Sequence, residues 1–415
     1  MVSLSPEYQV FKEENPDNVT QADLVVGLLA HDNEATIDKV AVKVSEGQAL
    51  DYPGLKTALV LSDHHSQDQT LAAFFAAATG PPKLAVVCHK DENQALQAIF
   101  NLLFVAARLK AKTVVVLNAD TLTTKRTWLK RLIQPLIQGM ADFTNPLYSR
   151  NAIDAPVTNL VIYPIFRALF GRRLRQPILT DWAFTHEVLE ALLAFRDWPD
   201  LPGVLIPELM VKALAVAKDF RICQSIMIEG RYGLSNKRMD TPHITGLFSE
   251  LTRGVFEAMT RFQDYWPKIV RSKPTSVIGT DLKPGLFPSR YEVRLEELFG
   301  EIHELIKNSE PEWRELLAGA PGDLRNYLLN VSLGDLEIDA RMWGSLLFYC
   351  GDLYGQLDGT AQVRLLKAIT PVFLARFLTF QKQTLGLAPT QVESKVEEGA
   401  DIVEKLKREL YGHLA

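Results

Sequence analysis

The chain has 415 residues, of which 47% are hydrophobic and 23% are charged, and its formal net charge at pH 7 is −5. This is an ordinary globular composition, and the length suggests two or three domains. The negative net charge gives no general reason to expect a nucleic-acid partner.

The three cysteines, Cys88, Cys223 and Cys350, are far apart and do not have the spacing of a metal site. We expect buried free thiols and a reducing, cytoplasmic location. The N-terminal segment lacks the basic start and apolar core of a signal peptide. The longest apolar run, residues 160–170, contains Arg167 and is shorter than the about 20 residues that a bilayer requires. We therefore expect no transmembrane segment.

The first 140 residues alternate between predicted strands and predicted helices. After an irregular lead-in over residues 1–21, buried strands are predicted at residues 22–30, 56–61, 83–87 and 113–117. Helices are predicted at residues 36–44, 68–79 and 92–109, and another begins at Thr127. This alternation is typical of βαβ units, with right-handed crossovers and a mostly parallel sheet.

The pattern changes after Gly139. Short strands are predicted at residues 142–146 and 220–229, and helices at residues 181–193, 207–218 and 244–266. Prolines and glycines in residues 271–289 predict a linker or crossing segment. From residue 290 onward the chain is predicted to be helical, and it ends in an amphipathic helix over residues 391–414 that suits a packing or dimer face. We therefore expect an α/β domain over residues 22–270 and a helical domain over residues 290–415.

Polar side chains follow two of the predicted parallel strands. Asp63 follows the second strand, and Asn118 and Asp120 follow the fourth. Ligands of open α/β sheets bind at the carboxyl ends of strands, and a carboxylate there can hold a divalent metal against a diphosphate. The alternative is that these residues only form turns or cap helices. His64 and His65 could also ligate a metal, although adjacent side chains usually point apart.

Five segments resemble a known family: ADLVVGLLAHDNEATI, LKTALVLSDHHSQDQT, VVVLNADT, PLYSRNAIDAPVTN and RQPILTDWAFT. They are similar to segments of nucleotide-sugar glycosyltransferases of the GT-A fold, family-2-like, and above all of mannosylglycerate synthase and the glucosyl- and mannosyl-phosphoglycerate synthases. The resemblance implies a GT-A α/β fold with a helical C-terminal domain. It also implies a nucleotide-diphosphate sugar donor, a small carboxylate- or phosphate-bearing acceptor, and Mn²⁺ or Mg²⁺ as cofactor.

The resemblance further implies roles for individual residues. By role, these are the nucleotide-sugar contacts Asp32, Glu34, Asp63 and Asn118, the metal ligands Asp120 and His243, the catalytic carboxylates Asp181 and Glu208, and the acceptor contacts Arg150 and Arg175. For the carboxylates, the alternative is a structural role, with Asp181 capping a helix at Trp182. For the arginine cluster Arg167, Arg172, Arg173 and Arg175, the alternative is a solvated face.

Several motif positions depart from the family pattern. The D-x-D pair is Asn118-Ala119-Asp120, and the two glycines that follow the second strand are His64 and His65. Two functional interpretations therefore stay open. The first is transfer of a hexose to an acceptor of the glycerate or phosphoglycerate type. The second is a glycosyltransferase-like protein that acts by binding a ligand or a partner subunit. The long C-terminal helices are compatible with a homodimer.

Overall fold

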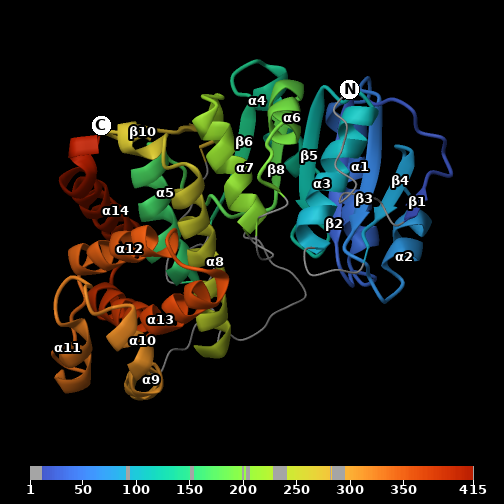
Figure 1. Ribbon diagram of the computed structural model, residues 1–415. Coiled ribbons are helices and arrows are strands. Elements are labelled where there is room, and N and C mark those ends of the chain that lie inside the picture. The colour runs from blue at the N-terminus through green and yellow to red at the C-terminus, as the bar shows by residue number, and fades with distance from the viewer. Residues whose placement is uncertain are drawn as a thin grey trace. The chain divides into compact units, whose positions relative to one another are not determined.

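The computed structural model describes residues 12–89, 94–149, 154–198, 201, 206–227, 241–280, 282 and 295–414 (Figure 1). The chain forms two compact units, each assembled from separate stretches of sequence. The first unit comprises Met1–Ser149, Ile178–Asn236 and Thr275–Leu282. The second comprises Arg150–Pro177, Lys237–Pro274 and Lys283–Ala415. The predicted α/β domain over residues 22–270 thus contains two stretches that group with the C-terminal helices.

The first unit contains a mixed, mostly parallel sheet whose nine strands lie in the order β1-β4-β3-β2-β5-β8-β6-β9-β11. In chain order these strands are β1 Lys12–Glu14, β2 Leu24–Ala30, β3 Thr57–Asp63, β4 Lys83–Val87, β5 Thr113–Asn118, β6 Phe143–Tyr148, β8 Trp182–Thr185, β9 Ile222–Met227 and β11 Ser276–Ile278. Strand β2 pairs in parallel with both β3 and β5. The predicted α/β class with a mostly parallel sheet is confirmed.

Helices cover both faces of this sheet (Figure 1). One group contains α1 Ile37–Asp51, α2 Thr70–Ala76 and α4 Thr127–Ile137, and the other contains α3 Gln94–Arg108, α6 His186–Leu193 and α7 Ile206–Ala217. Alternate residues of β2 face the first group, and Leu24, Val26 and Leu28 belong to its core. On the other face a Cβ atom at Gly27 would lie 2.1 Å from a methyl group of Leu102. A glycine at this position therefore lets α3 approach the sheet closely.

Two segments outside the predicted strands pair with the sheet edges. Residues Lys12–Glu14, which were expected to be an irregular lead-in, form β1 antiparallel to β4. Residues Ser276–Ile278, which lie in the predicted linker, form β11 parallel to β9. Both segments cover edge strands whose backbone groups would otherwise lack partners.

The helix predicted over residues 181–193 is wrong in its first part. Trp182–Thr185 form strand β8, which runs antiparallel to β5 and β6, and the helix α6 begins only at His186. The rings of Trp182 and Phe184 stack on Phe143 at centroid distances of 5.8 and 6.2 Å. Packing of these aromatic side chains across the sheet favours the strand over helical periodicity.

The second unit is helical. Its helices are α5 Tyr163–Phe170, α8 Thr241–Arg261, α9 Leu295–Asn308, α10 Glu310–Glu315, α11 Leu324–Asn330, α12 Ala340–Tyr354, α13 Gly359–Thr384 and α14 Pro389–Tyr411. Shorter elements are the π-helical turn Thr158–Ile162, the 3₁₀ turns Trp266–Lys268 and Gly412–Leu414, and the parallel pair β7 Arg172–Arg173 and β10 Lys273–Pro274. Helix α5 packs on α14, and α8 packs on α12 and α13. These contacts group the two inserted stretches with the C-terminal helices.

A buried arginine joins α5 to α14. The Arg167 side chain is 1% exposed and forms ion pairs with Glu397, Asp401 and Glu404. Ser272 donates to Glu404 through both its backbone N–H and its hydroxyl group. Burial opposes ionisation of Glu404, but the hydrogen bonds from Ser272 and Arg167 outweigh it and lower the pKa of this carboxyl. Arg167 is therefore part of the packing, not of a solvated face.

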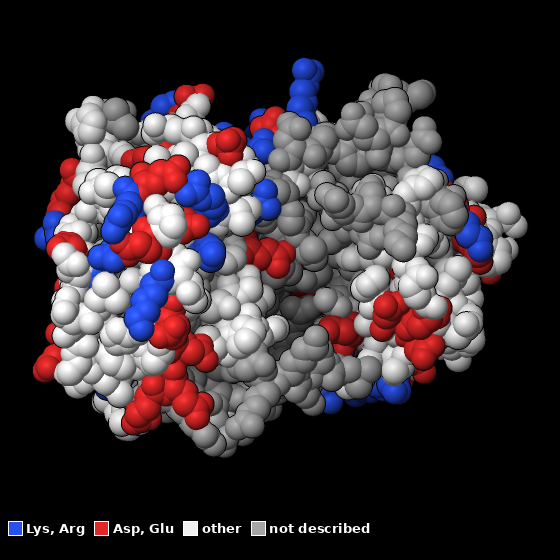
Figure 2. All heavy atoms as spheres, turned by 60° about the horizontal axis from the view of Figure 1, so that its bottom comes forward, with Lys and Arg blue, Asp and Glu red and all other residues white. Residues whose placement is uncertain are grey.

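The surface over the C-terminal helices carries both signs of charge. Figure 2 shows basic and acidic side chains interspersed there. Ion pairs of the C-terminal helices include Arg341 with Glu409 and Arg364 with Glu315. Within the described part of the chain, no helix combines the length and apolar character needed to cross a membrane. All three cysteines are buried free thiols, as the sequence predicted.

Arg167→Met should destabilise the protein strongly. The change would leave three carboxylates near one buried position without their shared cation, and breaking a buried pair costs about 3–5 kcal/mol. Urea unfolding monitored by circular dichroism measures the effect. The control is Arg341→Met, which removes an exposed ion pair and should change stability little. Equal effects of the two substitutions would contradict the structural role of Arg167.

Candidate functional site

The loops after β2 and β3 are tied together by reciprocal hydrogen bonds. The Asp32 carboxylate accepts from the backbone N–H of Gln67 at 2.7 Å, and the Glu34 carboxylate accepts from that of Gln69 at 2.9 Å. In return, the backbone N–H of Glu34 donates to Asp68 at 3.0 Å. Carboxylates that accept backbone N–H bonds hold loops in one conformation. Asp32 and Glu34, predicted to contact the nucleotide sugar, thus also order the loops at the strand ends.

Asp63 ends β3 and forms the turn that follows. Its carboxylate accepts from both the backbone N–H and the hydroxyl group of Ser66, at 3.0 and 2.6 Å. Burial raises the pKa of Asp63 above its ordinary value, although the bonds from Ser66 act in the opposite direction. His65, in the middle of this turn, has a φ of 62°. It adopts the left-handed backbone that glycine favours, at a position where the resembled family has glycine.

His64 is fixed by its backbone at the end of β3. Its N–H donates to the carbonyl oxygen of Ala30 at 2.8 Å, and its own carbonyl oxygen lies 3.1 Å from Nδ1 of His31. Nε2 of His64 is buried and has no hydrogen-bond partner among the described residues. Burial, with a smaller contribution from His31, lowers the pKa of His64 to about 4. The imidazole is therefore neutral at physiological pH.

Asp181 lies at the centre of a hydrogen-bond network between β5, β6 and β8. It is fully buried, and its two oxygens accept from the backbone N–H of Asn118 at 2.9 Å and from the Tyr148 hydroxyl group at 2.8 Å. Asn118 in turn accepts the backbone N–H of Asp120 at 2.9 Å. This network fixes the turn that presents Asn118 and Asp120. Asp181 precedes a strand instead of capping a helix, and its predicted catalytic role stays a prediction.

Glu208 approaches the same edge of the sheet from the first turn of α7. It is 5% exposed, and one of its oxygens lies 3.4 Å from the hydroxyl oxygen of Thr180. On the next turn of the helix, the buried Lys212 donates to the Leu179 carbonyl oxygen at 2.6 Å. These contacts fix α7 against the segment 179–181. The carboxylate predicted from the sequence is thus brought to the strand ends.

A pocket of about 200 Å³ lies where these elements meet. It is lined by Leu29, Ala30, His31, Asn33, His64, Ile99, Asn118, Asp120, Thr180 and Glu208. Three of the residues predicted from the sequence, Asn118, Asp120 and Glu208, therefore share one pocket. His31 and Thr180 were not predicted. The only sequence signal for His31 is that it follows a predicted buried strand, and the only one for Thr180 is that it precedes Asp181.

The predicted metal site is not formed by the described residues. None of them belong to a group of three or more His, Cys, Asp or Glu side chains placed to hold a metal ion. The Asn118 side-chain oxygen, the expected partner of Asp120, already accepts the Asp120 backbone N–H. Resident Mn²⁺ and Mg²⁺ sites use several oxygen ligands that converge on one point. This donor set does not fit such an ion.

The other predicted residues belong to the second unit or lie outside the described residues. His243 is in the first turn of α8 and does not line this pocket. The Arg175 guanidinium group donates to Glu393 at 2.9 Å and to Asn159 at 2.8 Å, and it packs on the ring of Tyr163. Arg150 lies outside the described residues. Acceptor binding by the two arginines stays a prediction.

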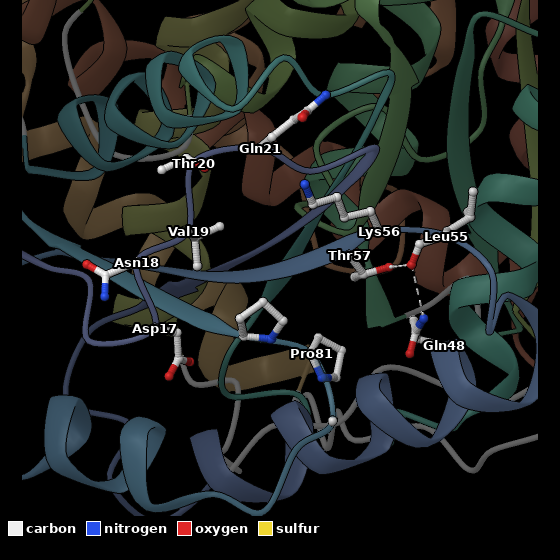
Figure 3. Close-up of a pocket in the computed structure, with 12 residues that line it drawn as sticks. Asp17, Asn18, Val19, Thr20, Gln21, Gln48, Leu55, Lys56, Thr57 and Pro81 are labelled. Carbon is white, nitrogen blue, oxygen red and sulfur yellow. Dashed lines mark hydrogen bonds between the residues drawn. The ribbon is translucent and has the colours of Figure 1, made fainter.

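A second pocket, of about 410 Å³, lies at the other end of the parallel strands, beside the amino end of β3 (Figure 3). Thr57 and Gln48 both donate to the Leu55 carbonyl oxygen there, at 3.1 and 3.4 Å. Ligands of parallel sheets bind at carboxyl ends because loops and helix N-termini converge there. The smaller pocket is therefore the better candidate site.

The fold and pocket define an α/β protein with a candidate ligand site at the carboxyl edge of its sheet. No protein-family model matches the chain, and no curated protein matches it. Among solved structures, the chain is similar to glucosyl-3-phosphoglycerate synthase from Mycobacterium tuberculosis in complex with phosphoglyceric acid. The TM-score is 0.44 and the identity 19%, over 57% of this chain and 80% of that chain.

A second structure of the same enzyme, in complex with Mn²⁺, UDP-glucose and phosphoglyceric acid, matches with a TM-score of 0.42 and 20% identity, over 57% of this chain and 80% of that chain. The crystal structure of a mycobacterial protein matches with a TM-score of 0.44 and 19% identity, over 57% of this chain and 74% of that chain. The resemblance predicted from the sequence is confirmed at this level, as a distant likeness in structure.

Asp181→Ala should lower the free energy of unfolding by about 2–4 kcal/mol, because two buried donors lose their acceptor. Thermal and urea unfolding measure the loss. Tyr148→Phe is the matched control, since it removes only one of the two bonds and should cost about 1 kcal/mol. An Asp181→Ala protein as stable as the wild type would show that the network does not hold the strand ends.

His64→Gln should reduce the dependence of stability on pH. The folded-state pKa of His64 is lowered from 6.5 to about 4, so between these values the unfolded state binds a proton that the folded state does not. Stability therefore falls as the pH falls through this window, by at most about 1.4 kcal/mol per pH unit from this group. Urea midpoints measured from pH 4 to 7 compare the two proteins. Identical slopes would contradict the neutral state of His64 in the folded protein.

Proposed function

We propose that this chain is a nucleotide-sugar-dependent glycosyltransferase that moves a hexose to a small acid of the glycerate or phosphoglycerate type. The main support is the pocket at the carboxyl ends of β2, β3 and β5, where Asn118, Asp120 and Glu208 meet. The sequence segments that resemble glycosyltransferases supply these same strand ends. Loops fixed by hydrogen bonds in advance lower the cost of ordering a ligand.

In this proposal each carboxylate has a distinct task. Asp120 is half-buried and lines the pocket, so it contacts the donor. Glu208 lines the same pocket and orients the acceptor, because a carboxylate accepts a hydroxyl hydrogen bond. Asp181 holds Asn118 in place from behind. Asp32, Glu34 and Asp63 order the donor-side loops.

The transfer itself forms one bond and breaks one. The acceptor hydroxyl oxygen bonds to the anomeric carbon of the sugar, and the bond from that carbon to the diphosphate oxygen breaks. The hydroxyl proton passes to a carboxylate acting as general base, for which Glu208 is the candidate. The nucleoside diphosphate leaves with the electron pair of the broken bond.

A second candidate function is ligand binding without transfer. It is favoured by the full use of the Asp181 oxygens in structural hydrogen bonds and by the lack of a three-ligand metal group among the described residues. In that case the pocket binds a sugar or nucleotide and reports its presence to a partner subunit. Turnover separates the two functions.

A panel of UDP-, GDP- and ADP-sugars tests donor binding. A ligand that binds only the folded state stabilises it by about 2.7 kcal/mol at a hundredfold excess over Kd. We expect one nucleotide sugar to raise the melting temperature more than its free nucleoside diphosphate does. If no nucleotide sugar raises the melting temperature at millimolar concentration, the glycosyltransferase proposal fails.

Asp120→Ala tests turnover with the donor that the panel selects and with glycerate or phosphoglycerate as acceptor. We expect release of nucleoside diphosphate to be abolished. The melting temperature should stay close to that of the wild type, because the Asp120 side chain is only half-buried. Asp219→Asn, at an exposed turn in the same unit whose left-handed backbone asparagine tolerates, is the control and should keep its activity. Full activity in Asp120→Ala would remove this residue from the site.

A further inference from the structure

No lysine or arginine is found among the described residues that line the pocket at the carboxyl ends of β2, β3 and β5. Its charged side chains are the carboxylates of Asp120 and Glu208, and its histidines are His31 and His64. Like charges about 4 Å apart repel by roughly 4 kcal/mol at an effective dielectric of 20. A diphosphate placed among these side chains would meet this repulsion, whereas a neutral group would not.

The same lining suits a polyhydroxyl ring. Carboxylate oxygens only accept hydrogen bonds, and sugar hydroxyl groups donate them. Asn33, Asn118 and Thr180 add polar groups, and Leu29 and Ile99 add an apolar wall against which the C–H face of a ring can pack. Pockets of this kind combine apolar walls with a few placed polar groups.

His64 lines the pocket, and its Nε2 atom is buried and has no hydrogen-bond partner among the described residues. Its backbone is fixed by Ala30, and its ring lies 6.4 Å from that of His31. A buried polar atom without a partner is costly unless a ligand or water satisfies it. The neutral imidazole offers one donor or one acceptor at Nε2, depending on its tautomer.

From these observations we propose that the pocket binds the neutral hexose directly and without a divalent metal ion, and that His64 is a specificity-determining residue that hydrogen-bonds a ring hydroxyl group. The inference rests on the proposed function for the view that this pocket holds the transferred sugar. It goes further in two statements. The first is that the pocket recognises the sugar part of the donor. The second is that no metal ion takes part in this recognition. The donor set around Asn118 and Asp120, which does not converge, supports the second statement.

The test measures binding of free D-glucose and D-mannose by ligand-observed NMR, each with EDTA and with Mn²⁺. We expect at least one hexose to bind with the same Kd in both conditions. His64→Ala should weaken binding about tenfold, which corresponds to the loss of one hydrogen bond of about 1.4 kcal/mol. His64→Gln should retain more affinity, because its amide reaches the position of Nε2.

The matched control is His65→Asn. It removes the neighbouring imidazole, which does not line the pocket, and asparagine tolerates the left-handed backbone at this position. It should bind hexose as the wild type does. If His64→Ala does not fold, His64→Gln and His64→Asn replace it, since asparagine places its amide near Nδ1 and should lose the affinity that glutamine keeps.

Three results would overturn the inference: hexose binding that requires Mn²⁺, hexose binding unchanged in His64→Ala, or no hexose binding at any accessible concentration. The proposed function fails separately. Hexose binding without any nucleotide-sugar binding or turnover would contradict the proposed glycosyltransferase activity and leave the inferred sugar pocket standing. Turnover without free-hexose binding would overturn the inferred sugar pocket and leave the proposed glycosyltransferase activity standing.

Discussion

The parallel register of β2 with β3 and β5 is the constraint on which the candidate site depends. It places Ala30 opposite Asp63 and Leu29 opposite Asn118, so that three strands end at one edge. Because parallel strands end at the same edge, the three loops meet without any further folding device. Buried β-branched and leucine residues along these strands fix the register, since a slip of one residue would turn every side chain to the other face.

The loops and strand ends of the site are held in place by hydrogen bonds to the site's own carboxylates. Asp32 and Glu34 accept backbone N–H groups across two loops, and Asp181 accepts from Asn118 and Tyr148. Such bonds preorganise a binding surface, but they occupy oxygens that a metal or a diphosphate-bound ion would need. Asp120 and Glu208 remain at the pocket, together with His31 and His64. The result is a pocket whose chemistry favours neutral hydroxyl-bearing groups.

Much of the fold could be predicted from the sequence, because its parallel strands are continuous apolar runs that end in turn residues. The same reasoning located Asn118 and Asp120, whereas Glu208 was predicted only from the resemblance to glycosyltransferases. It could not find β8, whose four residues are too short for a periodic signal and are held by aromatic packing. Nor could it group Arg150–Pro177 with the C-terminal helices, because the pairing of Arg167 with α14 joins residues more than two hundred positions apart. The buried Nε2 of His64 is likewise a product of tertiary packing and leaves no trace in local sequence.

The most direct test of the central claim is hydrogen–deuterium exchange with and without the nucleotide sugar that binds best. The account predicts slower exchange in the loops after β2, β3 and β5, which contain His31, His64 and Asp120, and unchanged exchange around Lys56 at the opposite edge of the sheet. Protection around Lys56 and Pro81, with none at the carboxyl ends, would place the ligand in the other pocket and contradict the account.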